Sequence, residues 1–267
     1  MAEQPGASGA LSVWARNFIA APRYPPEQRL SLVTDDGVRL AAVRLATCIR
    51  PHAAIVLIHG LTNWSRNPRI HRFAHDLARR AEVIVPDLRG HGGSQGRCSL
   101  GRDEPLDVAA AVSMAAASGL PVVTVGVSMG GVATLLHAGR FGGVAGTVAI
   151  SAPAGWVDLT THGATRIRRY VSSQVGRVVL AALCRTRVAR GMPVMIDDAA
   201  AAIGAIAPAF TVLVHDRADK YFPAQHATQL LDWAREPKEL WWTEGAGHGT
   251  DLLTTELADR ILTRLRQ

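Results

Sequence analysis

The sequence has few of the features that mark secreted, disulfide-stabilised or membrane-spanning chains. Its three cysteines are an odd number without a C-x-x-C pair, so we expect ordinary thiols rather than disulfides or a zinc site. No apolar run approaches ~18 residues without interruption, which predicts no transmembrane segment. The first residues lack a basic patch followed by an apolar core, so no secretory signal is expected. These absences favour a cytoplasmic protein.

Lysine is also scarce, and acidic residues are missing from one long segment. Only Lys220 and Lys238 are lysines among the 29 basic residues. Residues 159–196 contain no Asp, Glu or Lys, and their arginines account for the whole formal net charge of +7. Those arginines are Arg166, Arg168, Arg169, Arg177, Arg185, Arg187 and Arg190.

The chain of 267 residues alternates short apolar runs with helical patterns, which predicts an α/β fold with a mainly parallel sheet. Two β-rich runs flank a D-D-G turn and are expected to form a hairpin. Six further runs have the length and apolar character of strands buried on both faces. The predicted strands cover 29–34, 38–46, 53–60, 82–87, 121–128, 144–151, 210–216 and 238–244, and the helices 68–81, 104–118, 129–140, 224–236 and 250–267.

The alternation breaks at residues 154–207, where helical stretches follow one another without a strand. We expect this segment to be an arginine-rich helical lid on the carboxyl edge of the sheet, where open α/β sheets bind ligands. Residues 1–27 would be an N-terminal extension, and 28–153 with 208–267 the core. Within the lid, an amphipathic helix is expected to bury Ile167, Val171, Val175, Val178 and Ala182.

Two stretches fit the G-x-S-x-G pattern of a serine nucleophile, one centred on Ser94 and one on Ser128. Ser128 directly follows a strand pattern and directly precedes a helical one, which is the context of a nucleophile elbow. Ser94 lies in a glycine-rich polar stretch and is interpreted as a loop serine. We therefore predict Ser128 as the nucleophile.

A serine nucleophile needs a base that takes its proton and an acidic group that orients the base. His248 lies in a glycine-rich loop after the last predicted strand, and Asp219 in the loop after the preceding strand. The chain order Ser128, Asp219, His248 is the order this architecture requires. Asp216 and, more distantly, Asp158 remain alternative acids.

Backbone N–H groups near Ser128 are candidates for stabilising a developing oxyanion. Met129 begins the helix after the nucleophile, and Leu61 follows His59-Gly60 at the end of a strand. His59 itself is interpreted as a residue that shapes this turn. Four other histidines fall inside helical patterns and are expected to be surface or packing residues: His71, His75, His137 and His226.

Five motifs occur in order along the chain: I-H-G-L-T, V-P-D-L-R-G-H-G-G-S-Q-G, V-G-V-S-M-G-G, H-D-R-A-D-K-Y-F-P and G-A-G-H-G. With them the chain resembles the α/β-hydrolase superfamily over residues of about 30–260, in particular the branch of serine aminopeptidases, monoacylglycerol lipases and small esterases. The resemblance implies an eight-stranded, mostly parallel sheet flanked by helices, with a lid inserted after strand 6. Asp216 stands where this family often has glycine.

The resemblance implies hydrolysis of a carboxylic ester or thioester through an acyl-enzyme on Ser128. Alternatives are amide cleavage, carbon–carbon hydrolysis or acyl transfer by the same triad, and a binding protein without turnover. We expect a small acyl substrate, no metal or organic cofactor and no nucleic-acid partner. The lid arginines are either a solvated helix face or a surface that attracts anionic substrates, with Arg166, Arg169 and Arg177 as candidate contacts.

Overall fold

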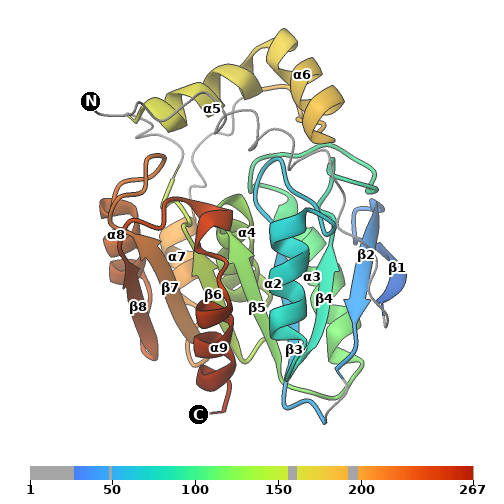
Figure 1. Cartoon of the computed structure of the whole chain (residues 1–267), viewed down its shortest axis with the longest axis vertical. Helices are drawn as coiled ribbons and strands as arrows, with labels where there is room; N and C mark the ends of the chain where they lie inside the picture. Colours follow the sequence, from blue (N-terminus) through green and yellow to red (C-terminus); the bar gives the residue numbers. More distant parts are fainter. Residues whose placement is uncertain (1–26, 48–49, 156–160, 192–197, 267) are drawn as a thin grey trace, which may run out of the picture.

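The computed structural model describes residues 27–47, 50–155, 161–191 and 198–266. In these ranges eight strands form one sheet with helices on both faces (Figure 1). All eight predicted strands are present, and the α/β fold class is confirmed. The strands are β1 (Glu27–Val33), β2 (Arg39–Leu45), β3 (Ala54–Ile58), β4 (Glu82–Pro86), β5 (Val122–Val127), β6 (Gly146–Ile150), β7 (Phe210–Asp216) and β8 (Lys238–Thr243).

The strand order is β1-β2-β4-β3-β5-β6-β7-β8, and β3 to β8 run parallel to one another. β1 and β2 form the predicted hairpin, and β2 pairs antiparallel with β4. Register brings Ile58 of β3 opposite Gly126 of β5, and Val127 of β5 opposite Ile150 of β6. The segments that leave β3, β5 and β6 therefore start side by side at one edge of the sheet.

Helices cover the two faces in separate layers. α2 (Pro68–Leu77) and α9 (Thr255–Arg264) pack on one face, seen in front of the sheet in Figure 1. α3 (Glu104–Ala116), α4 (Met129–Phe141) and α8 (Gln225–Trp233) pack on the other. None of the described helices combines the length and the apolar character needed to cross a membrane.

The last strand corrects one expectation. β8 was expected to be buried on both faces, but only Trp241 is buried, because β8 is the edge strand of the sheet. Arginine side chains lie over two tryptophan rings of this strand. The Cζ atom of Arg217 lies 4.4 Å from the Trp242 ring centroid, and that of Arg260 lies 3.9 Å from the Trp241 ring centroid.

Two short helices lie above the sheet after β6, α5 (His162–Ser172) and α6 (Gln174–Cys184) (Figure 1). They rest on segments that follow strands: the Thr161 hydroxyl donates to the Tyr221 carbonyl at 2.6 Å, and Thr186 and Val188 form bridges with His91 and Cys98. We call residues 161–191 the α5–α6 segment. α7 (Ala199–Gly204), also within the predicted lid, packs instead against α4 and α8 on the face of the core.

The predicted apolar stripe of the lid is wrong in its second half. Ser173 ends α5, and its hydroxyl accepts a hydrogen bond from Gly176 N at the start of α6, so the helical phase changes there. Val171 is buried, but Val175 and Val178 are 74% and 62% exposed, and Ala182 is exposed as well. The buried positions of the two helices are Ala164, Val171, Gly176, Leu180 and Cys184.

Candidate active site

Ser128 occupies the sharp turn between β5 and α4. Its φ of 53° and ψ of −117° lie in a region that residues with a side chain rarely adopt. Two glycines make the turn possible. A Cβ atom at Gly126 would lie 2.3 Å from the Gly130 carbonyl oxygen, and one at Gly130 would lie 2.5 Å from the His59 carbonyl oxygen. The turn therefore leaves the Ser128 side chain at the carboxyl edge of the sheet.

His248 and Asp219 converge on this serine. His248 Nε2 lies 3.0 Å from Ser128 Oγ, and His248 Nδ1 lies 2.7 Å from Asp219 Oδ2. The histidine follows β8 and is flanked by Gly247 and Gly249, both with positive φ. The structure thus brings together the three side chains that the sequence predicts as nucleophile, base and acid, in one hydrogen-bonded chain.

The two candidate acids after β7 have different partners. Asp219 Oδ1 accepts hydrogen bonds from Tyr221 N and Phe222 N, which leaves Oδ2 for His248. Asp216 instead accepts from Ala218 N, the Thr243 hydroxyl and Ala246 N. Burial raises the pKa of Asp216, but these hydrogen bonds outweigh it and hold that pKa below its usual value. The alternative acid Asp158 lies outside the described residues.

Three residues that sequence analysis did not single out position His248. The Ser151 hydroxyl, at the end of β6, accepts a hydrogen bond from Gly249 N at 3.0 Å and so fixes the loop that carries the histidine. The Tyr221 and Phe222 rings lie 4.7 and 5.4 Å from the imidazole, centroid to centroid. Their positions in the sequence could have indicated them, because Ser151 directly follows a strand next to β5 and the two aromatic residues closely follow Asp219.

The turn after β3 lies directly against the nucleophile. A Cβ atom at Gly60 would be 3.2 Å from the Ser128 Cβ atom, so the Gly60 backbone passes beside the reacting side chain, and Leu61 is the next residue. Met129, the other predicted oxyanion donor, is the first residue of α4, where a helix leaves its N–H groups unpaired within the helix. Met129 is therefore the next residue in the chain after Ser128, whereas Leu61 follows the glycine that contacts Ser128 in space.

His59 stabilises this turn, and its ring makes its hydrogen bonds to the backbone of Gly60 and Leu88. Its Nδ1–H donates to the Gly60 carbonyl at 2.8 Å, and its Nε2 accepts from Leu88 N at 3.0 Å. Complete burial lowers its pKa to about 4, so the ring is neutral near pH 7. These contacts agree with the turn-shaping role predicted from sequence.

Ser94 is buried away from this site. Its hydroxyl donates to the Asp87 carbonyl at 2.5 Å and accepts from Ala41 N at 2.9 Å, which ties the loop after β4 to β2. Asp87 uses its carboxylate in the same loop, accepting from Ser65 N and Gly93 N. The G-x-S-x-G match at Ser94 is thus a structural turn.

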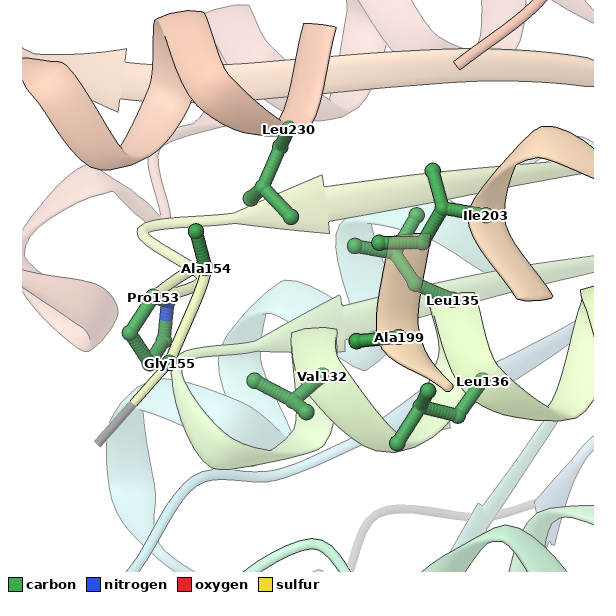
Figure 2. Close-up of a pocket in the computed structure, with 9 residues that line it drawn as sticks. All are labelled: Val132, Leu135, Leu136, Pro153, Ala154, Gly155, Ala199, Ile203 and Leu230. Atoms are coloured by element: carbon green, nitrogen blue, oxygen red, sulfur yellow. The ribbon is translucent and has the colours of Figure 1, made fainter. Parts of the chain in front are cut away.

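An apolar pocket lies beside α4, and Figure 2 shows the side chains around it. One of its lining residues, Val132, lies one turn along α4 from Ser128, whose carbonyl accepts the Val132 N–H at 3.2 Å. The opposite walls come from α7, α8 and the chain that leaves β6. The lining residues are Val132, Leu135, Leu136, Pro153, Ala154, Gly155, Ala199, Ile203 and Leu230, none of them charged.

The arginines of the α5–α6 segment are not neutralised by carboxylates. Within the described part of the chain none of the seven forms an ion pair, and the segment holds no acidic residue. Arg166 Nη2 lies 3.5 Å from the Tyr221 hydroxyl, and Arg168 and Arg169 are exposed. Arg177 differs, because it donates to the Val171 and Ser172 carbonyls at the end of α5. Its role there is to hold the two helices together.

Comparison with known proteins identifies the family. The model of the alpha/beta hydrolase family matches residues 55–266, so the chain belongs to that family. The Pyrococcus furiosus esterase Pf2001 is 18% identical and has a TM-score of 0.72, covering 93% of this chain and 95% of its own. The hydrolase GrgF from Penicillium sp. sh18 is also 18% identical, with a TM-score of 0.69 and coverage of 90% and 98%.

A third similar structure is the esterase domain of a Rhodothermus marinus protein, 20% identical, with a TM-score of 0.62 and coverage of 90% of this chain and 96% of its own. At such identities these structures share the fold. No curated protein sequence matches the chain significantly.

Proposed function

We propose that this alpha/beta hydrolase cleaves carboxylic esters or thioesters through an acyl-enzyme on Ser128. The observation that carries the proposal is the hydrogen-bonded chain from Asp219 Oδ2 through the His248 ring to Ser128 Oγ, with distances of 2.7 and 3.0 Å. A hydroxyl so placed can lose its proton to the imidazole as it attacks a carbonyl carbon. The strained turn places the half-buried Ser128 side chain at the carboxyl edge of the sheet, where a substrate would reach it.

The reaction follows from these contacts. Ser128 Oγ bonds to the acyl carbon while His248 Nε2 takes its proton, and the Asp219 carboxylate stabilises the resulting imidazolium. The carbonyl oxygen becomes an oxyanion, which the N–H groups of Met129 and Leu61 are proposed to stabilise. His248 then protonates the leaving alcohol or thiol as its bond to carbon breaks. Water, deprotonated by His248, releases the acid and regenerates the serine.

The surroundings of the site support a small acyl substrate with an apolar part and a negative charge. The uncharged pocket that Val132 helps to line would take a small apolar group. The unneutralised arginines above the carboxyl edge, Arg166 and Arg169 among them, would attract an anion such as a carboxylate or phosphate. Arg177 was also predicted to contact substrate, but we now assign it to the α5–α6 junction because its guanidinium already binds two backbone carbonyls.

A fluorophosphonate probe and a substrate panel test the proposal. We expect the probe to label wild type and not Ser128→Ala, because it reacts only with an activated serine. The panel contains p-nitrophenyl esters of graded acyl length, acyl-CoA thioesters and aminoacyl arylamides. Turnover of esters or thioesters above arylamides would support the assigned chemistry. Preferred cleavage of arylamides would reassign it to amides, and an unlabelled, folded wild type would contradict a serine mechanism.

A further inference from the structure

A second cluster of chemically active side chains joins the first strand to α2. Glu27 lies at the start of β1, and His71 and His75 lie on α2. Residues four apart share one face of a helix, and the two imidazole rings are 4.6 Å apart, centroid to centroid. Both Nε2 atoms face the same carboxylate oxygen: Glu27 Oε1 is 2.6 Å from His71 and 3.4 Å from His75.

The cluster is enclosed on one side and open on the other. The side chains of Glu27 and His71 are 7% and 3% exposed, whereas that of His75 is 32% exposed. An ion could therefore reach buried ligands past His75.

We propose that Glu27, His71 and His75 bind a divalent transition-metal ion, with Zn²⁺ as the best match. Two imidazole nitrogens and one carboxylate oxygen form a donor set that zinc accepts, with a water as fourth ligand. Bonds of about 2.0–2.1 Å in a tetrahedral site put ligand atoms roughly 3.3 Å apart. The His75–Glu27 distance already has this value, and the three ligand atoms lie within 4.8 Å of one another.

Arg66 controls the geometry and limits the affinity of this site. Its Nη1 atom lies 2.8 Å from Glu27 Oε2, so the carboxylate is held with Oε1 toward the histidines. A ligand oriented in this way loses little freedom when the metal binds. The guanidinium charge also repels a cation, so we expect micromolar rather than nanomolar affinity. Bound metal would fasten the edge strand β1 to the α2 layer.

Calorimetric titration of chelator-treated protein with Zn²⁺, and visible absorption with Co²⁺, test this site. We expect one Zn²⁺ bound per chain with micromolar affinity, a Co²⁺ d–d absorption band and a higher Tm with Zn²⁺ but not with Mg²⁺. His75→Gln and Glu27→Gln should each weaken binding at least about tenfold and remove the band. His162→Gln, which changes an exposed histidine on α5, is the matched control and should bind as wild type.

The active-site imidazole is a competing ligand, so each titration is repeated in the His248→Gln background. Binding that vanishes in that background, or that is equal in His75→Gln and His162→Gln, would overturn the proposal, as would the absence of Zn²⁺ binding. His75 is partly exposed, so His75→Gln should keep its circular dichroism spectrum and decides the question if Glu27→Gln does not fold.

Discussion

Ser128 shows how a single residue is held for function at the expense of stability. Its positive φ of 53° costs about 1–3 kcal/mol for a residue with a side chain. We predict that Ser128→Ala lowers kcat by at least ~10³-fold without loss of fold. Ser128→Gly should be equally inactive but about 1 kcal/mol more stable than Ser128→Ala, because glycine tolerates this conformation. Ester kinetics and urea unfolding measure the two effects. An active Ser128→Ala would show that another residue is the nucleophile.

Ser94 provides the matched control for the nucleophile. It fits the same sequence pattern, but its hydroxyl joins Asp87 to Ala41 and is almost fully buried. Ser94→Ala should leave kcat nearly unchanged and lower the free energy of unfolding by about 1–3 kcal/mol, because Ala41 N loses its acceptor. A kcat loss comparable with that of Ser128→Ala, on folded protein, would contradict our assignment of the two serines.

Substitutions of the two aspartates after β7 should differ in their effect on kcat, as those of the two serines do. Asp219→Asn removes the acceptor that orients His248, and we expect kcat to fall by roughly 10³–10⁴-fold. Asp216→Asn alters a carboxylate that accepts from Ala218, Thr243 and Ala246 and not from the His248 ring, so it should reduce stability with little change in kcat. Kinetics and thermal unfolding on both variants decide; the opposite order of kcat losses would make Asp216 the acid.

The α4 helix carries a buried histidine that makes stability depend on pH. His137 is 2% exposed, stacks on Phe141, and its Nδ1 has no hydrogen-bond partner in the described part of the chain. Burial lowers its pKa from 6.5 to about 4. As the pH falls through this range the unfolded chain binds a proton first. The folded state therefore loses stability, by about 1.4 kcal/mol per pH unit at the steepest point.

We predict that His137→Leu makes the free energy of unfolding less dependent on pH between about 6.5 and 4. Leucine binds no proton, so the difference from wild type should grow toward acid pH, to at most about 3 kcal/mol. At neutral pH the variant should be at least as stable as wild type, since no unpaired nitrogen is buried. Urea unfolding at a series of pH values measures this; parallel curves for the two proteins would refute it.

The strands of the core were predictable because the apolar runs in the sequence fall where the strands are buried. All eight strands appear close to their predicted positions, and Ser128, Asp219 and His248 each follow a parallel strand, so their convergence at one edge follows from topology. The α5–α6 stripe was not predictable, because Ser173 interrupts the helix through one local hydrogen bond. Glu27 and the α2 histidines meet only through tertiary packing, which no spacing in the sequence encodes.

Across the whole molecule, positive charge is concentrated over the site. Basic and acidic residues balance outside 159–196, so the formal net charge of +7 belongs to the segment that includes α5 and α6. Charge above a site raises the local concentration of oppositely charged substrates, and salt screens this attraction over ~8 Å at physiological ionic strength. We predict that kcat/KM for an anionic ester falls about three- to tenfold with added salt, while a neutral ester of similar acyl length changes little.

Removing the same number of arginines over the site or far from it distinguishes local attraction of the substrate from an effect of the protein's net charge. Three exposed arginines on α5 bind no carboxylate among the described residues: Arg166, Arg168 and Arg169. Changing all three to Gln should lower kcat/KM for the anionic ester at low salt. It should also remove most of the salt dependence of that kcat/KM. Arg177 is kept because it holds the α5–α6 junction.

The control changes Arg29, Arg39 and Arg72, exposed on β1, β2 and α2, to Gln. It lowers the net charge equally but should leave the salt response as in wild type. If both triple variants respond alike, or the neutral ester follows the anionic one, the arginines over the site do not select substrate by charge.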